Sequence, residues 1–410
     1  MSSLELRLAW RSLGRNRRRT GLTIAATAFS LALVVCMIGL SNGSHEQMIE
    51  DGVKMASGHL SIMAPGHLEE RTLEQPLPWN SDMSTMLEST PGLAGFTPRL
   101  ESFALISQGD STQGMLVRGT DPSREDDISS IKKRIVAGRF LTNEKEREIV
   151  LGQRGAETLG VSVGDEVLLY GIAYSLESAY DLFKVVGLIR FPDSMMERRL
   201  AFISLEDAQT FYVYPDKVTE VAILLEDSES VPDVQAALTQ SLDQEGTRVH
   251  PWPDVVPGLD QYVTLDKAGM YLILILLVLV VGFGILNTVL MTVLERKREL
   301  GVLLALGLRP SQVFRIVYIE SMLLATVGIA IGLIIAIPIV LYFQANPIPL
   351  EGSAAKALLD FNMEPVITWK LRASNPIGSS VVIFGVAILA ALYPAIKASR
   401  GQPIDVVQNV

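Results

Sequence analysis

The stretch LERKRELGVLLALGLRPSQVFRIVYIES, residues 294–321, is a short basic segment between two long apolar runs, residues 269–293 and 316–343. Short connections rich in Lys and Arg stay on the cytoplasmic side of a membrane. Moving one such charge to the bilayer centre costs about 2.5–3.5 kcal/mol on insertion scales. The sequence therefore predicts a stiff, helix-prone cytoplasmic connection between two membrane helices. Its basic residues are Arg296, Lys297, Arg298, Arg309 and Arg315.

Working outward, four apolar runs are each long enough to cross a bilayer. The predicted spans are residues 20–43, 268–294, 316–343 and 376–396. The basic residues 1–19 predict an amphipathic helix on the inner leaflet. A cleaved signal peptide is the competing interpretation, but the apolar stretch is too long and no A-x-A site follows it. We therefore expect both termini in the cytoplasm, with a coupling segment at 295–315, an outer loop at 344–375 and a tail at 397–410.

Charge separates a water-exposed domain from these spans. The chain has 410 residues, 49% of them hydrophobic, and a net charge of −10. Residues 44–266 hold 18 Lys/Arg against 37 Asp/Glu, whereas the remainder carries an excess of positive charge. This asymmetry predicts an acidic extracytoplasmic domain between basic-flanked membrane segments, and it argues against nucleic-acid binding. The single cysteine, Cys36, rules out an intramolecular disulfide, so this domain must rely on its core.

The predicted fold class is a membrane protein with four transmembrane α-helices and a large α+β extracytoplasmic domain inserted between the first and second helices. Short apolar runs such as His59–Met63 and Phe183–Ile189 predict strands, and Gln153–Leu159 predicts a helix. We expect two lobes, built from residues 80–120 and 139–225. The four histidines show no metal-ligand spacing and are interpreted as solvated surface residues. The charge runs Glu125–Asp127 and Glu144–Glu148 are interpreted as solvated turns.

Several residues outside the basic segment are candidates for contacts. The loop 191–199, FPDSMMERR, carries Phe191, Met195 and Met196, which would suit docking of a soluble partner if they were exposed. The alternative is that they pack inward on their own domain. Glu320 lies near the cytoplasmic start of its span and is expected to pair with an Arg. Small or polar residues of the spans are expected to pack helix against helix. They are Ala25, Ala28, Gly39, Gly282, Gly284, Asn287, Gly328 and Gly332.

Sequence motifs for catalysis are missing from the chain. It contains no Gly-Lys pair, so it cannot supply a P-loop of the G-x-x-x-x-G-K-[ST] type. G-x-S-x-G, H-E-x-x-H and C-x-x-C are also absent from the sequence. We therefore expect a non-catalytic chain that binds no cofactor or metal itself. Its cytoplasmic connection would transmit force from a separate nucleotide-hydrolysing partner. An ion channel or secondary transporter is disfavoured, because the spans hold too few polar residues to line a path.

Three stretches together resemble the FtsX-like and MacB-like permease family of ABC transporters. They are ERKRELGVLLALGLRPSQVFRIVYIESMLLATVGIAIG, GRFLTNEKEREIVLGQRGAETLGVSVGDEVLL and YPAIKASRGQPIDVV. The resemblance covers nearly the whole chain and implies an inner-membrane protein that works by mechanotransmission. It implies a permease dimer, with the same or a related chain, and a dimer of cytoplasmic ATPase subunits that bind ATP and Mg. It also implies that one set of residues forms or flanks the ATPase contact: Glu295, Arg298, Glu299, Gly301, Leu304, Gly307 and Arg309. The alternative that these residues only stabilise a helix by i, i+4 pairing stays open.

Within this family, the size, the four spans and the SNG…SGHLSI stretch are most similar to lipoprotein-releasing, Lol-type permeases. That similarity implies a lipoprotein substrate and a soluble carrier in the periplasm. The first and second spans, with Ala25, Ala28, Gly39, Gly282 and Gly284, would then separate as a lateral gate for acyl chains. The N-terminal sequence around 9–19 has only the general family form. MacB-like efflux of amphiphiles or peptides, and FtsX-like activation of a cell-wall hydrolase, remain the alternatives.

Overall fold

The computed structural model describes residues 17–55, 57–142, 147–191, 194–242, 247–360 and 365–399. The predicted amphipathic helix at 1–19 and the tail at 397–410 therefore lie mostly outside the described residues. The chain is organised as two compact units. The membrane unit comprises residues 1–46, 264–350 and 366–410, and the sheet unit comprises residues 47–263 and 351–365.

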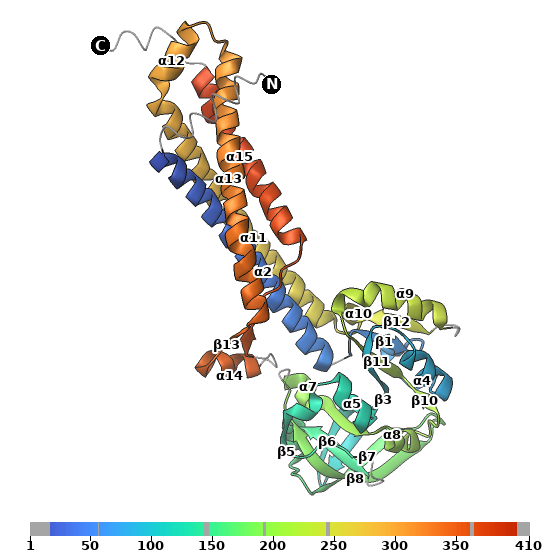
Figure 1. Ribbon diagram of the computed structural model, residues 1–410. Helices are drawn as coiled ribbons and strands as arrows, with labels where there is room; N and C mark the ends of the chain where they lie inside the picture. Colours follow the sequence, from blue (N-terminus) through green and yellow to red (C-terminus); the bar gives the residue numbers. More distant parts are fainter. Residues whose placement is uncertain are drawn as a thin grey trace. The chain divides into compact units, whose positions relative to one another are not determined.

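The membrane unit is built from four long helices, α2 (Arg17–Met55), α11 (Pro257–Glu295), α13 (Pro310–Ala345) and α15 (Ser374–Ser399). Residues 47–55 of α2 and 257–263 of α11 belong to the sheet unit. Each is long and apolar enough to cross a membrane, which confirms the four predicted spans as helices. All four helices continue beyond the apolar runs that predict them. A short helix, α12 (Lys297–Ala305), connects α11 to α13 (Figure 1). Beyond α13, the two-residue strands β13 (Ile348–Pro349) and β14 (Val366–Ile367) pair with each other.

Helix packing in the membrane unit depends on glycines. A Cβ built on Gly332 of α13 would lie 2.8 Å from the Ala28 carbonyl oxygen of α2. One built on Gly328 would lie 2.7 Å from the Thr27 side chain. These approaches bring the backbones of α2 and α13 together, as small-xxx-small patterns do. The neighbouring buried side chains include Leu31, Val35, Ala336 and Val340.

We expect Gly332→Leu to separate α2 from α13 and to lower the stability of the membrane unit by about 1–3 kcal/mol, the usual cost of overpacking. The matched control is Gly284→Leu on α11, because an added Cβ there meets nothing within 4 Å. Thermal unfolding of the full chain in detergent measures both variants. Equal losses in the two variants would show that the close approach is not what stabilises this packing.

The sheet unit contains one ten-stranded sheet, in the order β12-β1-β11-β3-β4-β9-β6-β8-β5, with β7 paired to both β3 and β8. Because β7 joins β8 back to β3, six strands close into a ring: β3, β4, β9, β6, β8 and β7. Pairing is antiparallel except between β4 and β9 and between β6 and β8. The sheet strands are β1 (Leu60–Met63), β3 (Leu93–Gln108), β4 (Ser111–Thr120), β5 (Ile135–Gly138), β6 (Glu148–Gly152), β7 (Glu166–Ile172), β8 (Ser178–Ile189), β9 (Leu200–Ser204), β11 (Glu220–Leu225) and β12 (Arg248–Pro251).

Short helices and one small strand pair accompany this sheet. The strands β2 (Leu77–Pro78) and β10 (Lys217–Val218) pair separately. The helices are α3 (His67–Glu70), α4 (Ser81–Glu88), α5 (Pro122–Ile128), α6 (Gln153–Leu159), α7 (Ser194–Arg199), α8 (Leu205–Phe211), α9 (Val231–Ser241), α10 (Trp252–Val255) and α14 (Gly352–Asp360). Two 3₁₀ turns span Ile131–Arg134 and Ser228–Ser230.

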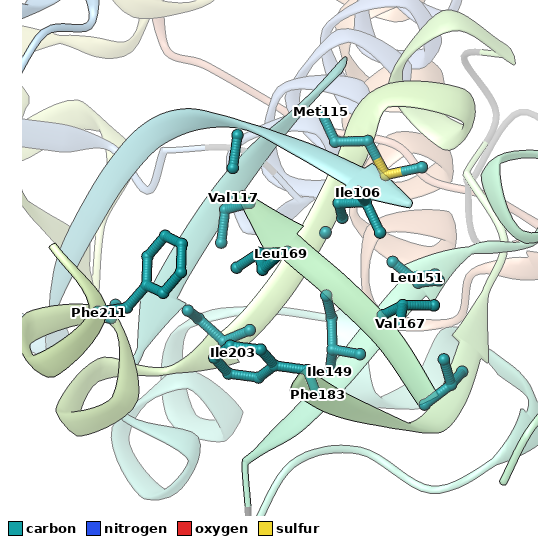
Figure 2. Packing of buried hydrophobic residues seen from close by; sticks show 14 of the residues in the cluster. Ile106, Met115, Val117, Ile149, Leu151, Val167, Leu169, Phe183, Ile203 and Phe211 are labelled. Atoms are coloured by element: carbon teal, nitrogen blue, oxygen red, sulfur yellow. The ribbon is translucent and has the colours of Figure 1, made fainter. Parts of the chain in front are cut away.

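The inside of the ring is filled by apolar side chains from all six strands (Figure 2). They include Ile106, Val117, Ile149, Val167, Phe183 and Ile203, and all are 2% exposed or less. Along β7 the burial alternates residue by residue, as expected for a strand with one face toward a core. Burying each large apolar side chain contributes about 1.5–3 kcal/mol. The closed ring therefore supplies the main core of this unit.

A second apolar cluster lies on the β12-β1-β11-β3 part of the sheet, where α4 and α9 contribute Leu87 and Leu238. The strand β3 serves both clusters, with Phe96 in this one and Leu100 in the ring. The two lobes predicted at residues 80–120 and 139–225 are therefore wrong in their ranges. Strands of the first range pair with strands of the second, since β4 pairs with β9 and β3 with β7.

Candidate functional site

The coupling segment folds as a helix and a turn between α11 and α13. Arg296 separates the end of α11 from α12, and Gly307, with a φ of 96°, lies in the turn after α12. Pro310 occupies the first position of α13, where the missing N–H costs nothing. The Gln312 side chain accepts a hydrogen bond from the Arg309 N–H at 2.8 Å. Apolar side chains, including Leu300, Val313 and Ala395, pack this segment against the end of α15.

A partly buried ion pair joins the start of this segment to α13. Arg296 Nη1 donates to Glu320 Oε2 at 2.7 Å, and Arg296 Nε donates to Glu299 Oε2 at 3.2 Å. Glu320 is 5% exposed, so its carboxylate depends on this partner. Burial alone would lower the pKa of Arg296, but the Glu320 carboxylate outweighs it and raises that pKa. The pairing predicted for Glu320 is confirmed, whereas Arg296 was not among the predicted contact residues. The signal for Arg296 in the sequence is its positive charge in this basic segment, which it shares with four other residues.

The predicted ATPase-contact residues divide into two groups by exposure. Glu295, Arg298, Gly307 and Arg309 are exposed, while Glu299 and Leu304 are half-buried and Gly301 is buried. Two apolar side chains of the same segment, Val302 and Leu306, are 53% and 76% exposed. Together with Val302 and Leu306, the exposed predicted residues form a mixed apolar and charged surface. Gly301 is buried and contributes to packing within the segment. The ATPase contact itself stays a prediction.

The small residues predicted for the spans do not gather between α2 and α11. A Cβ on Gly39 would meet Val340 of α13 at 2.9 Å, and one on Gly282 would meet Val386 of α15 at the same distance. Ala28 is buried, whereas Ala25, Gly284 and Asn287 are exposed in this single chain. Where α2 does face α11, a cavity of about 440 Å³ is lined by larger side chains such as Phe29, Leu33 and Leu276. The lateral gate stays a prediction.

Two of the three apolar side chains of the loop 191–199 pack against the sheet unit. Phe191 is 3% exposed and stacks on Phe202, with ring centroids 6.2 Å apart. Met196 packs against the same cluster. Of the three residues only Met195, on α7, is exposed, at 64%. The alternative that these side chains pack inward is therefore confirmed for Phe191 and Met196, because the sheet supplies an apolar cluster that receives them. Docking through Met195 stays a prediction.

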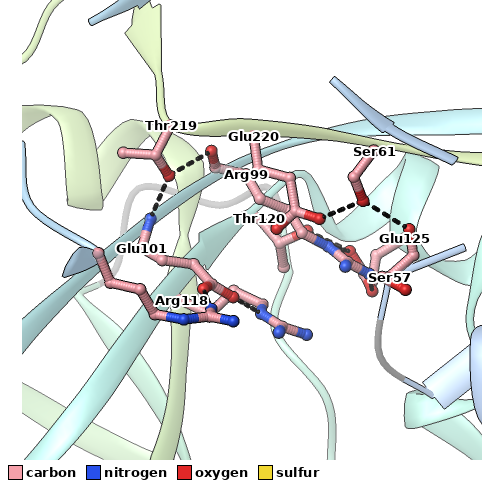
Figure 3. Close-up of polar contacts among 10 residues, drawn as sticks. Ser57, Ser61, Arg99, Glu101, Arg118, Thr120, Glu125, Thr219 and Glu220 are labelled. Carbon is pink, nitrogen blue, oxygen red and sulfur yellow. Dashed lines mark hydrogen bonds and ion pairs between the residues drawn. The ribbon is translucent and has the colours of Figure 1, made fainter. Parts of the chain in front are cut away.

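Several charges of the sheet unit are buried (Figure 3), and one of them, Glu125, belongs to a run interpreted as a solvated turn, whose other members Asp126 and Asp127 are exposed. Glu125 is 1% exposed and receives hydrogen bonds from Arg99 Nη2 at 2.6 Å and from Thr120. Glu101 is fully buried between Arg118 and Arg71. Burial alone would raise the pKa of Glu101, but these two guanidinium groups lower it to about 2. The interpretation of Glu125 as part of a solvated turn is therefore wrong.

Glu148 shows the same arrangement at the start of β6. It is 2% exposed and accepts a hydrogen bond from Arg139 Nη1 at 2.9 Å. Burial alone would raise the pKa of Glu148, and the hydrogen bond from Arg139 lowers it. The run at 144–148 is therefore not a solvated turn at its last residue, while Glu144 to Glu146 lie outside the described residues.

The histidines are also more buried than the sequence suggested, because tertiary structure encloses them. His45 is 6% exposed and its Nε2 lies 2.6 Å from Asp266 Oδ2. His67 is 2% exposed, and burial lowers its pKa. His59 is fully buried: the Leu225 N–H donates to its Nδ1 at 3.1 Å, so its Nε2–H donates to Glu50. The interpretation of these three histidines as solvated is wrong.

His59 lies in the SGHLSI stretch that carries part of the family resemblance. Gly58 precedes it with a φ of +70°, and a Cβ there would lie 2.4 Å from the Ile223 carbonyl oxygen. Only glycine fits both conditions. Two residues after His59, Ser61 donates to Glu220 at 2.7 Å. The stretch therefore ties the last turns of α2, through Glu50, to the strands β1 and β11 within the sheet unit.

A pH effect follows from the Glu50–His59 contact. The hydrogen bond from His59 lowers the pKa of Glu50 from 4.5 to about 2. Its stabilising contribution is thus complete above pH 4.5 and is lost as the pH falls toward 2. We expect Glu50→Gln to destabilise the sheet unit at pH 7 by about 1.5 kcal/mol, typical of a hydrogen bond to a charged group. The acid-induced loss of stability should be smaller in this variant than in the natural protein.

Denaturant unfolding at several pH values, followed by tryptophan fluorescence, measures this effect. The matched control is Glu69→Gln, which removes an exposed carboxylate of the same unit. If both variants show the same pH profile as the natural chain, Glu50 does not contribute.

Two models of known protein families match this chain. A family model described as the MacB-like periplasmic core domain matches residues 20–241. A second model, the FtsX-like permease C-terminal domain, matches residues 271–403. The second match contains the coupling segment and the Arg296–Glu320 pair.

Curated relatives match nearly the whole chain. The lipoprotein-releasing system transmembrane protein LolE of Haemophilus influenzae is 25% identical, covering 94% of this chain and 93% of the relative. LolC of Neisseria meningitidis is 23% identical over the full length of both chains. The pyoverdine export ATP-binding/permease protein PvdT of Pseudomonas putida is 25% identical, covering 98% of this chain and 59% of that protein.

Among solved structures, the periplasmic region of MacB from Actinobacillus actinomycetemcomitans matches 50% of this chain and 94% of its own length, with 11% identity and a TM-score of 0.36. The two family models together account for both units, and the first alone covers more than half of the chain. The chain belongs to the ABC transporter permeases that combine a MacB-like periplasmic core domain with an FtsX-like C-terminal domain.

Proposed function

We propose that this chain is the permease subunit of an ABC transporter that extracts lipoproteins from the inner membrane and passes them to a soluble carrier. The observation that carries the proposal is the match to LolC and LolE proteins over at least 94% of this chain. Those relatives are named as parts of a lipoprotein-releasing system. The sheet unit would lie outside the membrane, inserted between the first and second spans.

The mechanical part of the proposal rests on the coupling segment. Its exposed side chains, Arg298, Leu306 and Arg309 among them, offer an apolar and charged surface to a cytoplasmic ATPase. The Arg296–Glu320 pair joins this segment to α13, so a force on α12 would be passed to a membrane helix. ATP and Mg would bind to the ATPase partner, and a second permease chain would complete the complex.

The sidedness can be tested with two introduced cysteines in a Cys36→Ala background, since Cys36 is the only cysteine of the chain. Leu176 in the sheet unit is 84% exposed, and Leu306 in the coupling segment is 76% exposed. We expect a membrane-impermeant maleimide to label Leu176→Cys in spheroplasts and Leu306→Cys only after lysis. Labelling of both sites in spheroplasts would contradict the proposed topology.

The activity is tested by reconstituting the full complex in proteoliposomes with a fluorescent, acylated lipoprotein. We expect release into the soluble phase only with ATP, and none when the ATPase partner cannot hydrolyse ATP. The match to a pyoverdine export protein favours one further candidate, efflux of an amphiphile. Transport of a labelled amphiphile with no release of lipoprotein would select that candidate and overturn the lipoprotein proposal.

A further inference from the structure

The membrane unit contains a cavity of about 550 Å³ that is separate from the coupling segment. It is bounded by α2, α11 and α15, and its volume lies within the range of small-molecule sites in proteins. Most of the wall is apolar, with Ile38, Leu274, Val278 and Ile383 among the lining side chains. We call it the α15 cavity, because that helix supplies its distinctive polar groups.

One end of the α15 cavity carries hydrogen-bond donors that the described residues leave unused. Asn375 is 9% exposed and Ser379 is 5% exposed, and both line the cavity. Neither Asn375 Nδ2 nor Ser379 Oγ has a hydrogen-bond partner among the described residues. Buried polar groups are normally paired, and leaving them unpaired is costly. Four residues apart on α15, the two share one helix face and point to a common ligand.

The next serine provides a contrast on the same helix. Ser380 Oγ donates to the Pro376 carbonyl oxygen at 2.6 Å, so its hydroxyl is satisfied within α15. Ser379 lacks such a bond although its position in the helix would allow one to the residue four before it. The unpaired hydroxyl of Ser379 is therefore a feature of the cavity and not of serine in this helix.

The charges around this end favour a ligand rich in oxygen acceptors. Lys267 of α11 lines the cavity and brings an ammonium group. The nearby Asp266 carboxylate is already engaged by His45 at 2.6 Å. An amide N–H, a hydroxyl and an ammonium all donate hydrogen bonds, and ester carbonyl or phosphate oxygens accept them. The long apolar wall fits an acyl chain.

We propose that the α15 cavity binds one lipid, with an acyl chain along α11 and α15 and its ester or phosphate oxygens at Asn375, Ser379 and Lys267. This site does not depend on the lipoprotein-release proposal. A membrane phospholipid and the acylated end of a lipoprotein share this chemistry, and the experiment below separates them.

The test uses the complete transporter in nanodiscs that contain phosphatidylglycerol with a photoreactive diazirine on its acyl chain. We expect crosslinks to concentrate on residues 270–279 and 378–383. Gly378 lines the cavity, and a Cβ added there meets nothing within 4 Å, so Gly378→Leu fills the space. This variant should reduce the crosslinks at least fivefold. The matched control is Gly385→Leu on the same helix, which also has open space but does not line the cavity, and it should leave them unchanged.

The polar end is tested separately with Asn375→Leu and Ser379→Ala, each of which should reduce crosslinking, against Ser380→Ala, which should not.

Competition by a synthetic triacylated lipopeptide identifies the acylated protein as the natural ligand, and persistence of the label identifies a phospholipid. Crosslinks no denser than on the exposed face of α11 around Val280 and Phe283 would overturn the site. A complex that releases lipoprotein normally but shows no label would refute this site alone.

Discussion

Exchanging Glu125 for Gln is expected to lower the free energy of unfolding of the sheet unit by about 3–5 kcal/mol, the usual cost of breaking a buried ion pair. Arg99 and Glu125 are each 1% exposed, and two hydrogen bonds join them, the shorter at 2.6 Å. Burial alone would raise the pKa of Glu125, but Arg99 holds it below its ordinary value. The variant keeps the side-chain volume and removes only the charge that neutralises Arg99.

Two comparisons make this expectation specific. The double variant Arg99→Met with Glu125→Leu should recover most of the loss, because a buried ion pair can be replaced by apolar side chains at little cost. Glu88→Gln removes a carboxylate that is 58% exposed and pairs with Arg124 at the surface, and its effect should stay within about 1 kcal/mol. Denaturant unfolding of the full chain measures all three. A double variant as unstable as the single one would show that the charge itself is not responsible.

If the proposed ATP-driven release of lipoprotein is the activity of the complex, replacing Arg296 by Met is expected to reduce it at least tenfold while the chain still inserts and folds. The change leaves the carboxylate of Glu320, 5% exposed, without the guanidinium that lies 2.7 Å away. Removing one partner of a buried ion pair costs several kcal/mol of stability. Each 1.4 kcal/mol changes an equilibrium constant tenfold. The contact between α12 and α13 should therefore loosen.

Three further variants separate coupling from folding. Glu320→Gln should impair release in the same way, and Arg296→Lys should retain part of it, because the charge remains without the planar geometry of Arg. The exchange Arg296→Glu with Glu320→Arg should restore more release than either single change. The ATPase rate of each complex is recorded beside release. Normal release by Arg296→Met would show that the pair does not transmit force.

Features that depend on local pattern could be predicted from the sequence. The four membrane helices follow from the length of their apolar runs, and the strand at His59–Met63 and the helix at Gln153–Leu159 follow from residue periodicity and turn residues. The Glu320 pairing could be predicted because the nearby segment is rich in Arg, although the partner could not be chosen among several.

Features that depend on pairing across the chain could not be predicted. A run such as Glu125–Asp127 reads as solvated, since charged side chains are mostly exposed. The burial of Glu125 alone within this run requires Arg99, which is 26 residues away and on another element. His59 likewise depends on the Leu225 N–H, 166 residues away. The sequence leaves open whether Phe191 is exposed or packs inward, and its contact with Phe202 and the neighbouring residues depends on the tertiary fold. Closure of the strand ring through β7 has no local signature at all.

The sixteen residues of β3 join both apolar clusters of the sheet unit along one uninterrupted strand. Its first half pairs with β11, and its second half pairs with β4 and β7. Neither cluster can melt without removing hydrogen-bond partners from the other. In hydrogen exchange, the slowest-exchanging amides of both clusters should therefore open together in one event. The sheet unit should also move as one rigid body when a helix attached to it is displaced.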